Sequence, residues 1–356
     1  MGGFDSARRL LGLAYEAAMS NFGSLECPYK LTFSVTYLCQ SRCKTCNIWQ
    51  IKPRDELGLA EVKEFASKNR GFRWIEITGG EPFLRSDIVE IVRAFWDSSA
   101  GLYVVTMPTN SLCNHDMVVG KVRQMLEMGI PKISITVSLD GYRELHDNVR
   151  GISGNFDRCI EMFRKLSELK KSYGNLFLVF GYTMSKYNQG ELEKTFNEVK
   201  KEIPWITHND FHINMGQISD SYYRNGSIDL SPDREFAAAE IKEFVSRRNF
   251  QPGMIPIIEG IFLKKLSEYV RTARQPMKSK SLDASLFLDS YGNVYPSIMW
   301  SRKIGNIRET GYSLGEIWKN SEAEEVRKII NEGREPVSWT ACEAYQSIVG
   351  NVKGII

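Results

Sequence analysis

Residues 37–46 read Tyr37-Leu38-Cys39-Gln40-Ser41-Arg42-Cys43-Lys44-Thr45-Cys46, and they contain three cysteines with the spacing CxxxCxxC. The preceding run, Leu31–Tyr37, is rich in β-branched and aromatic residues and predicts a strand that leads directly into the cysteines. Three thiolates on one loop can hold three corners of an iron–sulfur cubane. The spacing therefore predicts a metal centre at the end of a strand, with a fourth iron that no neighbouring residue binds.

A structural zinc site is the alternative interpretation of these cysteines. Zinc in such sites has four ligands, often supplied as two close pairs. The sequence has no second CxxC pair, and its four histidines, His115, His146, His208 and His212, all lie far from the cysteines along the chain. The spacing therefore favours an iron–sulfur cluster over zinc.

The seven cysteines also bear on the compartment, because their number is odd and three of them are clustered. This pattern argues against a secreted disulfide framework and favours a metal protein in a reducing compartment, so we predict a cytoplasmic location. No apolar run approaches the ~18 residues that a membrane span requires. Tyr15, Glu16 and Asn21 interrupt the apolar N-terminal segment, which argues against a signal peptide.

The composition is that of a globular protein with a large core, since 42% of the 356 residues are hydrophobic and 25% are charged. The formal net charge of +3 is small and dispersed, which argues against a nucleic-acid partner. Residues Ser6–Asn21 predict a helix whose apolar face is mostly alanine. We interpret it as a lid on the core, in preference to a helix that associates with a membrane surface.

Strands and helices alternate from Leu31 to Gln217, which predicts a parallel sheet with right-handed crossovers. The predicted strands are Leu31–Tyr37, Trp74–Thr78, Leu102–Met107, Lys132–Leu139, Leu176–Thr183 and Asp210–Met215. The predicted helices are Ala60–Lys68, Asp87–Trp96, His115–Met128, Asn155–Tyr173 and Gly190–Glu202. The pattern alone does not separate a partial barrel from a flat doubly wound sheet, but in both the chemistry lies at the C-terminal ends of the strands.

The pattern changes after Gln217. We predict two helices at Pro232–Arg248 and Ile255–Arg274, a hairpin within Leu286–Pro296 and a last helix at Glu322–Glu332. The expected organisation is an N-terminal helical segment (1–29), an α/β domain (30–218), a helical connection (219–280) and a small α+β C-terminal extension (281–356).

A second motif, Thr78-Gly79-Gly80-Glu81-Pro82, follows the second predicted strand. Its two glycines let the backbone approach a ligand closely, and Pro82 stiffens the turn. With this motif one βα unit after CxxxCxxC, residues 31–185 resemble the radical S-adenosylmethionine (SAM) enzymes. Three further stretches carry the resemblance: Pro108-Thr109-Asn110, Val137-Ser138-Leu139-Asp140-Gly141 and His146-Asp147-Asn148-Val149-Arg150-Gly151.

The resemblance implies a (β/α)6 partial TIM barrel in which Cys39, Cys43 and Cys46 bind a [4Fe–4S] cluster and SAM binds the fourth iron. It implies reductive cleavage of SAM to methionine and a 5′-deoxyadenosyl radical, which removes a hydrogen atom from substrate. The electron is expected from an external donor such as flavodoxin or ferredoxin. The residues implied to bind SAM are Gly79, Gly80, Glu81, Pro82, Thr109, Asn110, Ser138, Asp140 and Arg150.

Other roles are open to four of these residues. Turn or helix-cap chemistry is the alternative for Asn110, Ser138 and Asp140, and a surface salt bridge is the alternative for Arg150. One departure from the family is Thr45, because an aromatic residue often precedes the third cysteine, and Trp49 is the candidate replacement.

Residues Leu286–Gly350 resemble the SPASM or twitch extension of these enzymes, which carries auxiliary clusters in the family. The matching pieces are Asp289–Pro296, Gly305-Asn306, Leu314-Gly315-Glu316-Ile317-Trp318 and Cys342. A cysteine normally follows the hairpin, but Ser297 stands there, and Ser281 and Ser338 stand near other expected cysteines. We therefore predict no auxiliary cluster, and both a natural loss and a replacement of cysteine by serine would explain it.

The predicted reaction is hydrogen abstraction from a peptide or small molecule, leading to C–H modification, oxidation or crosslinking. A lipid or isoprenoid substrate is the alternative, and a non-catalytic iron–sulfur sensor or scaffold is the rival from another class. The sensor is disfavoured because it has no need of the glycine motif. Candidate pocket residues are Tyr182, His212, Asn214, Gln217, Tyr222 and Tyr223, and candidate catalytic residues are Cys342, Tyr182 and His212.

Overall fold

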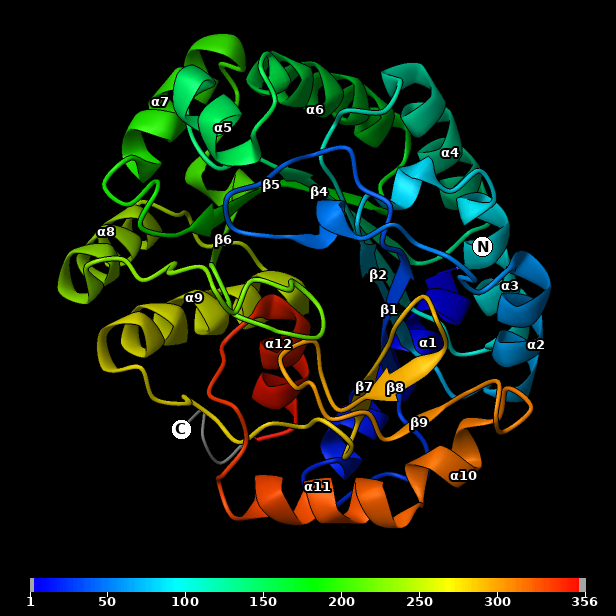
Figure 1. Cartoon of the computed structure of the whole chain (residues 1–356). Helices are drawn as coiled ribbons and strands as arrows, with labels where there is room; N and C mark the ends of the chain where they lie inside the picture. Colours follow the sequence, from blue (N-terminus) through cyan, green and yellow to red (C-terminus); the bar gives the residue numbers. More distant parts are fainter. Residues whose placement is uncertain (1–2, 352–356) are drawn as a thin grey trace.

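A computed structural model describes residues 3–351, and its centre is a set of six parallel strands that curve into a partial barrel (Figure 1). The strands are β1 (Lys30–Thr36), β2 (Trp74–Gly79), β3 (Val104–Thr109), β4 (Lys132–Ser138), β5 (Leu176–Met184) and β6 (Phe211–Met215). The helices between them are α2 (Leu59–Lys68), α3 (Ile88–Ser98), α4 (His115–Glu127), α5 (Arg143–Arg150), α6 (Asn155–Ser172) and α7 (Leu192–Glu202). The predicted (β/α)6 barrel is confirmed, and each strand lies within two residues of its predicted bounds.

The alternation of residues along each strand explains why the barrel encloses a cavity. In β4, Ile133, Ile135 and Val137 are buried in the core between the sheet and the outer helices. The residues between them are small or polar, are only half-buried and line the barrel interior. Because successive side chains of a strand point to opposite faces, the apolar set holds the helices and the other set leaves space inside.

The C-terminal part of the chain closes the open side of the barrel. Its elements are α8 (Arg234–Ser246), α9 (Met254–Thr272), β7 (Ser285–Leu288), β8 (Asn293–Tyr295), β9 (Gly305–Asn306), α10 (Leu314–Trp318), α11 (Ser321–Asn331) and α12 (Ala341–Val349). Strand β7 pairs in parallel with β1, and β8 and β9 continue the same sheet in antiparallel fashion. Helices α9 and α12 pack on each other between β6 and β7 (Figure 1), so this part of the chain forms one wall of the barrel.

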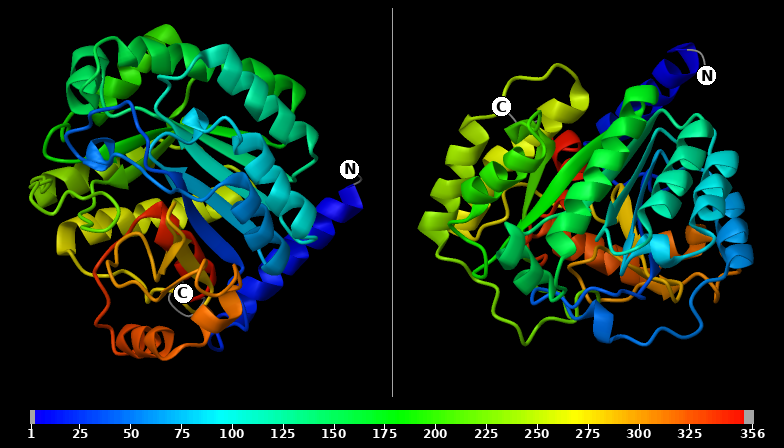
Figure 2. Two further views of the ribbon diagram at one scale, coloured as in Figure 1. Left: turned by 45° about the vertical axis from the view of Figure 1, so that its right-hand side comes forward. Right: turned by 90° about the horizontal axis from the view of Figure 1, so that it is seen from above.

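Helix α1 (Gly3–Met19) covers the N-terminal ends of the strands. Leu13 and Ala17 are buried on its inner face and pack with Tyr29, Tyr103 and Val104. The right-hand view of Figure 2 shows α1 on the side of the molecule opposite the loop that follows β1. The terminal residues of the predicted N- and C-terminal segments, 1–2 and 352–356, lie outside the described residues. In the range 3–351, no helix is both long and apolar enough to cross a membrane.

Candidate functional site

The glycine motif lies directly against the start of the cysteine loop. Gly79 has a φ of +124°, and a Cβ atom there would come within 2.1 Å of the carbonyl oxygen of Thr36. A Cβ atom on Gly80 would come equally close, at 2.1 Å, to the carbonyl oxygen of Leu38. The Gly80 amide donates a hydrogen bond of 2.7 Å to Thr36. The sequence predicts that these glycines let the backbone approach a ligand closely. In the structure they also let it approach Thr36 and Leu38 closely, and this contact fixes the cysteine loop.

The C-terminus of α5 holds the other side of the cysteine loop. The amides of Arg42 and Lys44 donate to the carbonyls of Arg150 and Val149, at 2.9 and 2.8 Å. Gly151 then ends the helix in the left-handed conformation, with a φ of +70°. The sequence did not predict α5, because the helix has only eight residues and few of them are apolar.

The three cysteines line a pocket of about 210 Å³ at the C-terminal ends of the strands, the cluster pocket. The predicted SAM-binding residues that also line it are Gly79, Gly80, Glu81, Thr109, Asn110, Ser138, Asp140 and Arg150. Further lining residues are Thr45, Trp49, Asn214, Gln217, Tyr222 and Tyr223. Pro82 does not line the pocket but begins the short 3₁₀ helix Pro82–Leu84. The structure therefore brings together residues from six strand ends that are far apart in the sequence.

Each cysteine sulfur in the cluster pocket accepts a hydrogen bond from nitrogen. The donors are Asn110 Nδ2 to Cys39 (3.7 Å), Arg150 Nη1 to Cys43 (3.8 Å) and the Ile48 amide to Cys46 (3.4 Å). Donors aimed at sulfur favour the thiolate form that iron requires. Burial opposes the thiolate form, because burial raises the pKa of the Cys39 thiol to about 11 and that of the Cys46 thiol to about 12. The residues thus fit a cluster whose irons stabilise the thiolates.

The side chains of the described residues are not arranged to hold a single metal ion. Among residues 3–351 the structure shows no group of three or more histidine, cysteine or acidic side chains that could hold one ion. A cubane does not need such convergence, since each of its three cysteines binds a different iron.

Arg150 is fixed by a buried ion pair. Its Nε lies 2.6 Å from Asp140 Oδ2, and the side chains of Arg150 and Asp140 are only 13% and 1% exposed. The other carboxylate oxygen of Asp140 accepts a hydrogen bond of 2.8 Å from the Thr183 amide. The pair lines the pocket wall beside Cys43, so Arg150 is not the surface salt bridge that the sequence left open. A guanidinium held in this way can bind a carboxylate.

Glu81 joins the turns after β2 and β3. Its carboxylate accepts hydrogen bonds from the amides of Asn110 (2.6 Å) and Phe83 (3.3 Å). Burial raises the pKa of Glu81 to about 7, against the lowering effect of these two amides. The side chain therefore positions the pocket wall in addition to lining it.

A second and larger hollow, the barrel cavity, has a volume of about 500 Å³ and runs inside the barrel from the cluster pocket to α1. It shares five lining residues with the cluster pocket: Thr78, Pro108, Ser138, Thr183 and Asn214. Its far end is lined by Trp74, Val104 and Lys132, the first residues of β2, β3 and β4. A molecule in this cavity would therefore face the cluster pocket directly.

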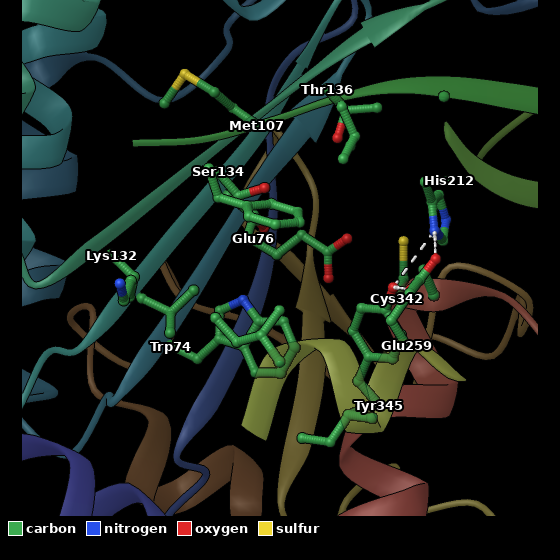
Figure 3. A pocket seen from close by; sticks show the side chains of 18 of the residues that line it. Trp74, Glu76, Met107, Lys132, Ser134, Thr136, His212, Glu259, Cys342 and Tyr345 are labelled. Carbon is green, nitrogen blue, oxygen red and sulfur yellow. Dashed lines mark hydrogen bonds and ion pairs between the residues drawn. The ribbon is translucent and has the colours of Figure 1, made fainter. Parts of the chain in front are cut away.

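One polar cluster in the cavity wall ties three elements together (Figure 3). His212 Nδ1 of β6 lies 3.0 Å from Glu259 Oε1 of α9. The hydroxyl of Tyr345, on α12, donates to the same carboxylate and lies 3.4 Å from His212. Burial raises the pKa of Glu259, but His212 and Arg248 outweigh it and lower the pKa to about 2. The candidate His212 thus holds the barrel wall together while it faces the cavity.

A second polar cluster contains Cys342 (Figure 3). Lys30, which is fully buried, forms a 2.8 Å ion pair with Glu76 and a 3.0 Å hydrogen bond to Gln346 Oε1. The Cys342 thiol contacts the Glu76 carboxylate, and burial together with that charge raises the pKa of the thiol. The sequence missed Lys30, Glu76, Glu259 and Tyr345, although a glutamate in the apolar run of β2 was a usable signal.

The remaining candidates have other contacts. The Tyr182 hydroxyl donates to the carbonyl of Asn188 at 2.7 Å and is fully buried, so it is bound to the chain itself. Ser281 donates to Glu343 (2.9 Å), Ser297 accepts from the Met299 amide (3.2 Å), and the amide of Ser338 donates to Gln275 (2.7 Å). The three serines therefore take part in separate hydrogen bonds.

Part of the chain matches a protein-family model. Residues 33–199 match the family model described as Radical SAM superfamily. A protein from Methanosarcina barkeri (strain Fusaro / DSM 804), named AdoMet-dependent heme synthase, is 28% identical over 323 residues, which span 83% of each chain.

Solved structures share the fold. SuiB from Streptococcus suis, solved with S-adenosylmethionine, superimposes with a TM-score of 0.59 at 16% identity, covering 86% of this chain and 69% of SuiB. The anSMEcpe structure with bound AdoMet gives a TM-score of 0.60 at 14% identity, covering 92% of this chain and 98% of that one. SuiB has also been solved with its precursor peptide SuiA.

Proposed function

The chain belongs to the radical SAM superfamily, and from this premise we propose that it cleaves SAM at a [4Fe–4S] cluster held by Cys39, Cys43 and Cys46 and acts on a C–H bond of a substrate in the barrel cavity. One observation carries the proposal: the cluster pocket and the barrel cavity share five lining residues. A substrate there would lie within reach of the group that the cluster pocket holds.

The residues of the cluster pocket have defined tasks in this proposal. The three cysteines bind iron, and the donors from Asn110 and Arg150 stabilise their charge. Arg150, held by Asp140, also offers its remaining donors to the carboxylate of SAM. When bound, the cluster and SAM supply a carbon radical that can remove a hydrogen atom from an unactivated C–H bond. An external donor such as flavodoxin or ferredoxin supplies the electron.

The barrel wall shields this chemistry from water on the side between β6 and β7. Helices α9 and α12 cover the side between β6 and β7, and the contacts of His212, Glu259 and Tyr345 bind them to β6. Exclusion of water protects a reactive radical from side reactions.

We favour a small and mostly apolar molecule as the substrate. The volume of about 500 Å³ is within the range of small-molecule sites, and most of the lining is apolar. A peptide is the second candidate, because SuiB has been solved with a precursor peptide and shares this fold. A peptide substrate would place one side chain, not its whole length, in the cavity.

Formation of 5′-deoxyadenosine tests the proposal. The anaerobically reconstituted and reduced protein should form 5′-deoxyadenosine and methionine from SAM. The variants Cys39→Ala, Cys43→Ala and Cys46→Ala should form neither, whereas Cys27→Ala, at an exposed cysteine outside the pocket, should match the unmodified protein. If the unmodified protein binds iron and SAM but never cleaves SAM, the proposal is wrong.

A further inference from the structure

The outer face of α1 carries a stripe of large apolar side chains. Phe4, Leu11 and Tyr15 on the helix and Phe22 just after it are 87%, 69%, 62% and 86% exposed. The spacing of seven and four residues places Phe4, Leu11 and Tyr15 along one line of the helix, since an α-helix has 3.6 residues per turn. Phe22 follows three residues after the end of α1. The inner face of α1 packs on the barrel, so the helix is apolar on two opposite sides.

A second exposed apolar segment lies where α9 begins. Phe250, Met254 and Ile257 are exposed there, and Met254 also lines the barrel cavity. The right-hand view of Figure 2 shows the turn between α8 and α9 on the same side of the molecule as the N-terminal half of α1. Most other large hydrophobic side chains exposed in the described chain are scattered singly over other elements. Exposed apolar side chains grouped on one side of a protein mark an interaction site.

The stripe is continuous with the mouth of the barrel cavity. Ala14 and Ala18 are exposed on α1 and also line the cavity. On the helix surface they neighbour Leu11 and Tyr15, because residues three or four apart lie side by side. An apolar path therefore runs from the outer face of α1 over the alanines into the cavity.

We propose that α1 and the start of α9 dock on a lipid bilayer, and that the barrel cavity takes a lipophilic substrate from it. This substrate class rests on the function proposed above. A bilayer fits better than a protein partner, because a partner on this surface would seal the mouth, whereas hydrocarbon chains can pass through it. Lys132 lines the cavity, and within residues 3–351 its ammonium group forms no ion pair or hydrogen bond, so it can meet a lipid phosphate.

Vesicle co-sedimentation tests the docking surface. The full-length reconstituted protein should sediment with phosphatidylcholine vesicles that contain about a quarter phosphatidylglycerol. The variant Leu11→Ser/Tyr15→Ser should bind at least about tenfold more weakly, since it removes two inserting side chains. Phe250→Ser/Ile257→Ser, in the second exposed segment where α9 begins, should also weaken vesicle binding.

A matched control is available at the other end of the barrel. Met117 and Phe236 are 37% and 53% exposed and do not line the cavity, and they lie in the first turns of α4 and α8, which follow the C-terminal ends of β3 and β6. Met117→Ser/Phe236→Ser should bind vesicles as the unmodified protein does. Docking is overturned if the unmodified protein does not sediment with vesicles, or if Leu11→Ser/Tyr15→Ser and Met117→Ser/Phe236→Ser bind them equally. A dimer in lipid-free buffer that Leu11→Ser/Tyr15→Ser converts to monomer would identify a second copy as the occupant and overturn it too.

Uptake into the cavity is tested with a fluorescent long-chain polyene fatty acid. Trp74 lines the cavity, so a bound polyene should accept energy from its indole. Ser134→Phe fills the middle of the cavity and should weaken probe binding at least about tenfold without changing vesicle binding. Unchanged probe binding in Ser134→Phe, or no binding at all, would overturn a lipophilic ligand.

Failure of the two proposals can be told apart. Vesicle and probe binding need neither iron nor SAM, so Cys39→Ala should retain both while it loses SAM cleavage. Leu11→Ser/Tyr15→Ser should retain 5′-deoxyadenosine formation while it loses vesicle binding. A loss of SAM cleavage in the unmodified protein with intact vesicle binding refutes the proposed function but not the docking surface.

Discussion

The two ends of the barrel differ in the groups that they hold in place. At the C-terminal ends of the strands, hydrogen bonds or an ion pair hold the cysteine sulfurs, Glu81, Asp140 and Arg150, although Gln217 Nε2 has no partner among residues 3–351. At the N-terminal ends, the Tyr29 hydroxyl and the Trp74 indole nitrogen are buried beside an apolar cavity with no partner among residues 3–351. One end is built to hold a fixed charged group, and the other leaves room for a molecule that supplies its own contacts.

Iron content gives the largest expected contrast between the ends. The reconstituted protein should bind about four irons, equivalent to one cubane. Cys39→Ala, Cys43→Ala and Cys46→Ala should each lose nearly all of it, because two thiolates do not hold a cubane. Cys342→Ser, in the wall of the barrel cavity, should lose none. An iron assay together with the visible absorption spectrum measures both effects.

Two outcomes would break this contrast. About eight irons in the unmodified protein, equivalent to two cubanes, would show that the extension holds a cluster. Loss of iron in Cys342→Ser would show that the wall of the barrel cavity takes part in iron binding.

The buried pair of Asp140 and Arg150 gives the next largest effect. Arg150→Met should lower the free energy of unfolding by about 3–5 kcal/mol, because it leaves the Asp140 carboxylate buried without a counter-charge. The double variant Asp140→Asn/Arg150→Met should recover part of that loss. Urea unfolding under anaerobic conditions measures both.

Arg143 on the same helix is the matched control. Its ion pairs with Asp157 and Glu202 are solvent-exposed, so Arg143→Met should change the free energy of unfolding by no more than about 1 kcal/mol. Equal losses in Arg143→Met and Arg150→Met would mean that burial does not set the strength of the Asp140–Arg150 pair.

The sequence predicted the cluster pocket far better than the barrel cavity, and the reason is physical. The strands and the glycine turn have local signals: a period of two, β-branched runs and residues that permit a positive φ at Gly79. Strand ends of a parallel sheet meet at one edge, so residues such as Asn110 and Arg150 could be grouped before the fold was known.

The wall of the barrel cavity has no comparable local signal. The pairing of β7 with β1 joins residues about 255 positions apart, and no short pattern specifies it. The positions of α9 and α12, and hence the contacts of Glu259 and Tyr345 with His212, depend on that closure. The cavity itself results from small residues such as Ser134 that only the curved sheet brings together.

Glu343 on α12 predicts a pH dependence at the cavity end. Burial raises its pKa to about 7, although Lys30 and the Ser281 hydroxyl lower it. A carboxyl group with a raised pKa in the folded state stabilises the protein fully below its unfolded pKa of about 4.5, and this contribution is lost as pH rises through about 7. From about pH 5 to about pH 8 the loss should reach roughly 2–3 kcal/mol.

Glu343→Gln isolates this contribution. Glutamine keeps an oxygen that can accept from Ser281 but does not titrate. The difference in the free energy of unfolding between the two proteins should shift toward the variant as pH rises, and urea unfolding at each pH measures it. A difference that stays constant over this range would show that Glu343 titrates normally in the folded protein.

A pair of tyrosines gives the smallest and most direct comparison of the two ends. The Tyr222 hydroxyl accepts from the Gly79 amide (3.0 Å) and lies 2.7 Å from Thr78 Oγ1. Tyr222→Phe removes this acceptor from the part-buried Gly79 amide and should lower the free energy of unfolding by about 1–2 kcal/mol. Tyr29→Phe removes a buried hydroxyl that has no partner in the described chain and should leave stability unchanged or raise it by up to about 1 kcal/mol. Thermal and urea unfolding of the two variants measure the contrast. A loss in Tyr29→Phe as large as in Tyr222→Phe would mean that the cavity end, too, satisfies its polar groups, through ordered water, and that its space is not reserved for an apolar ligand.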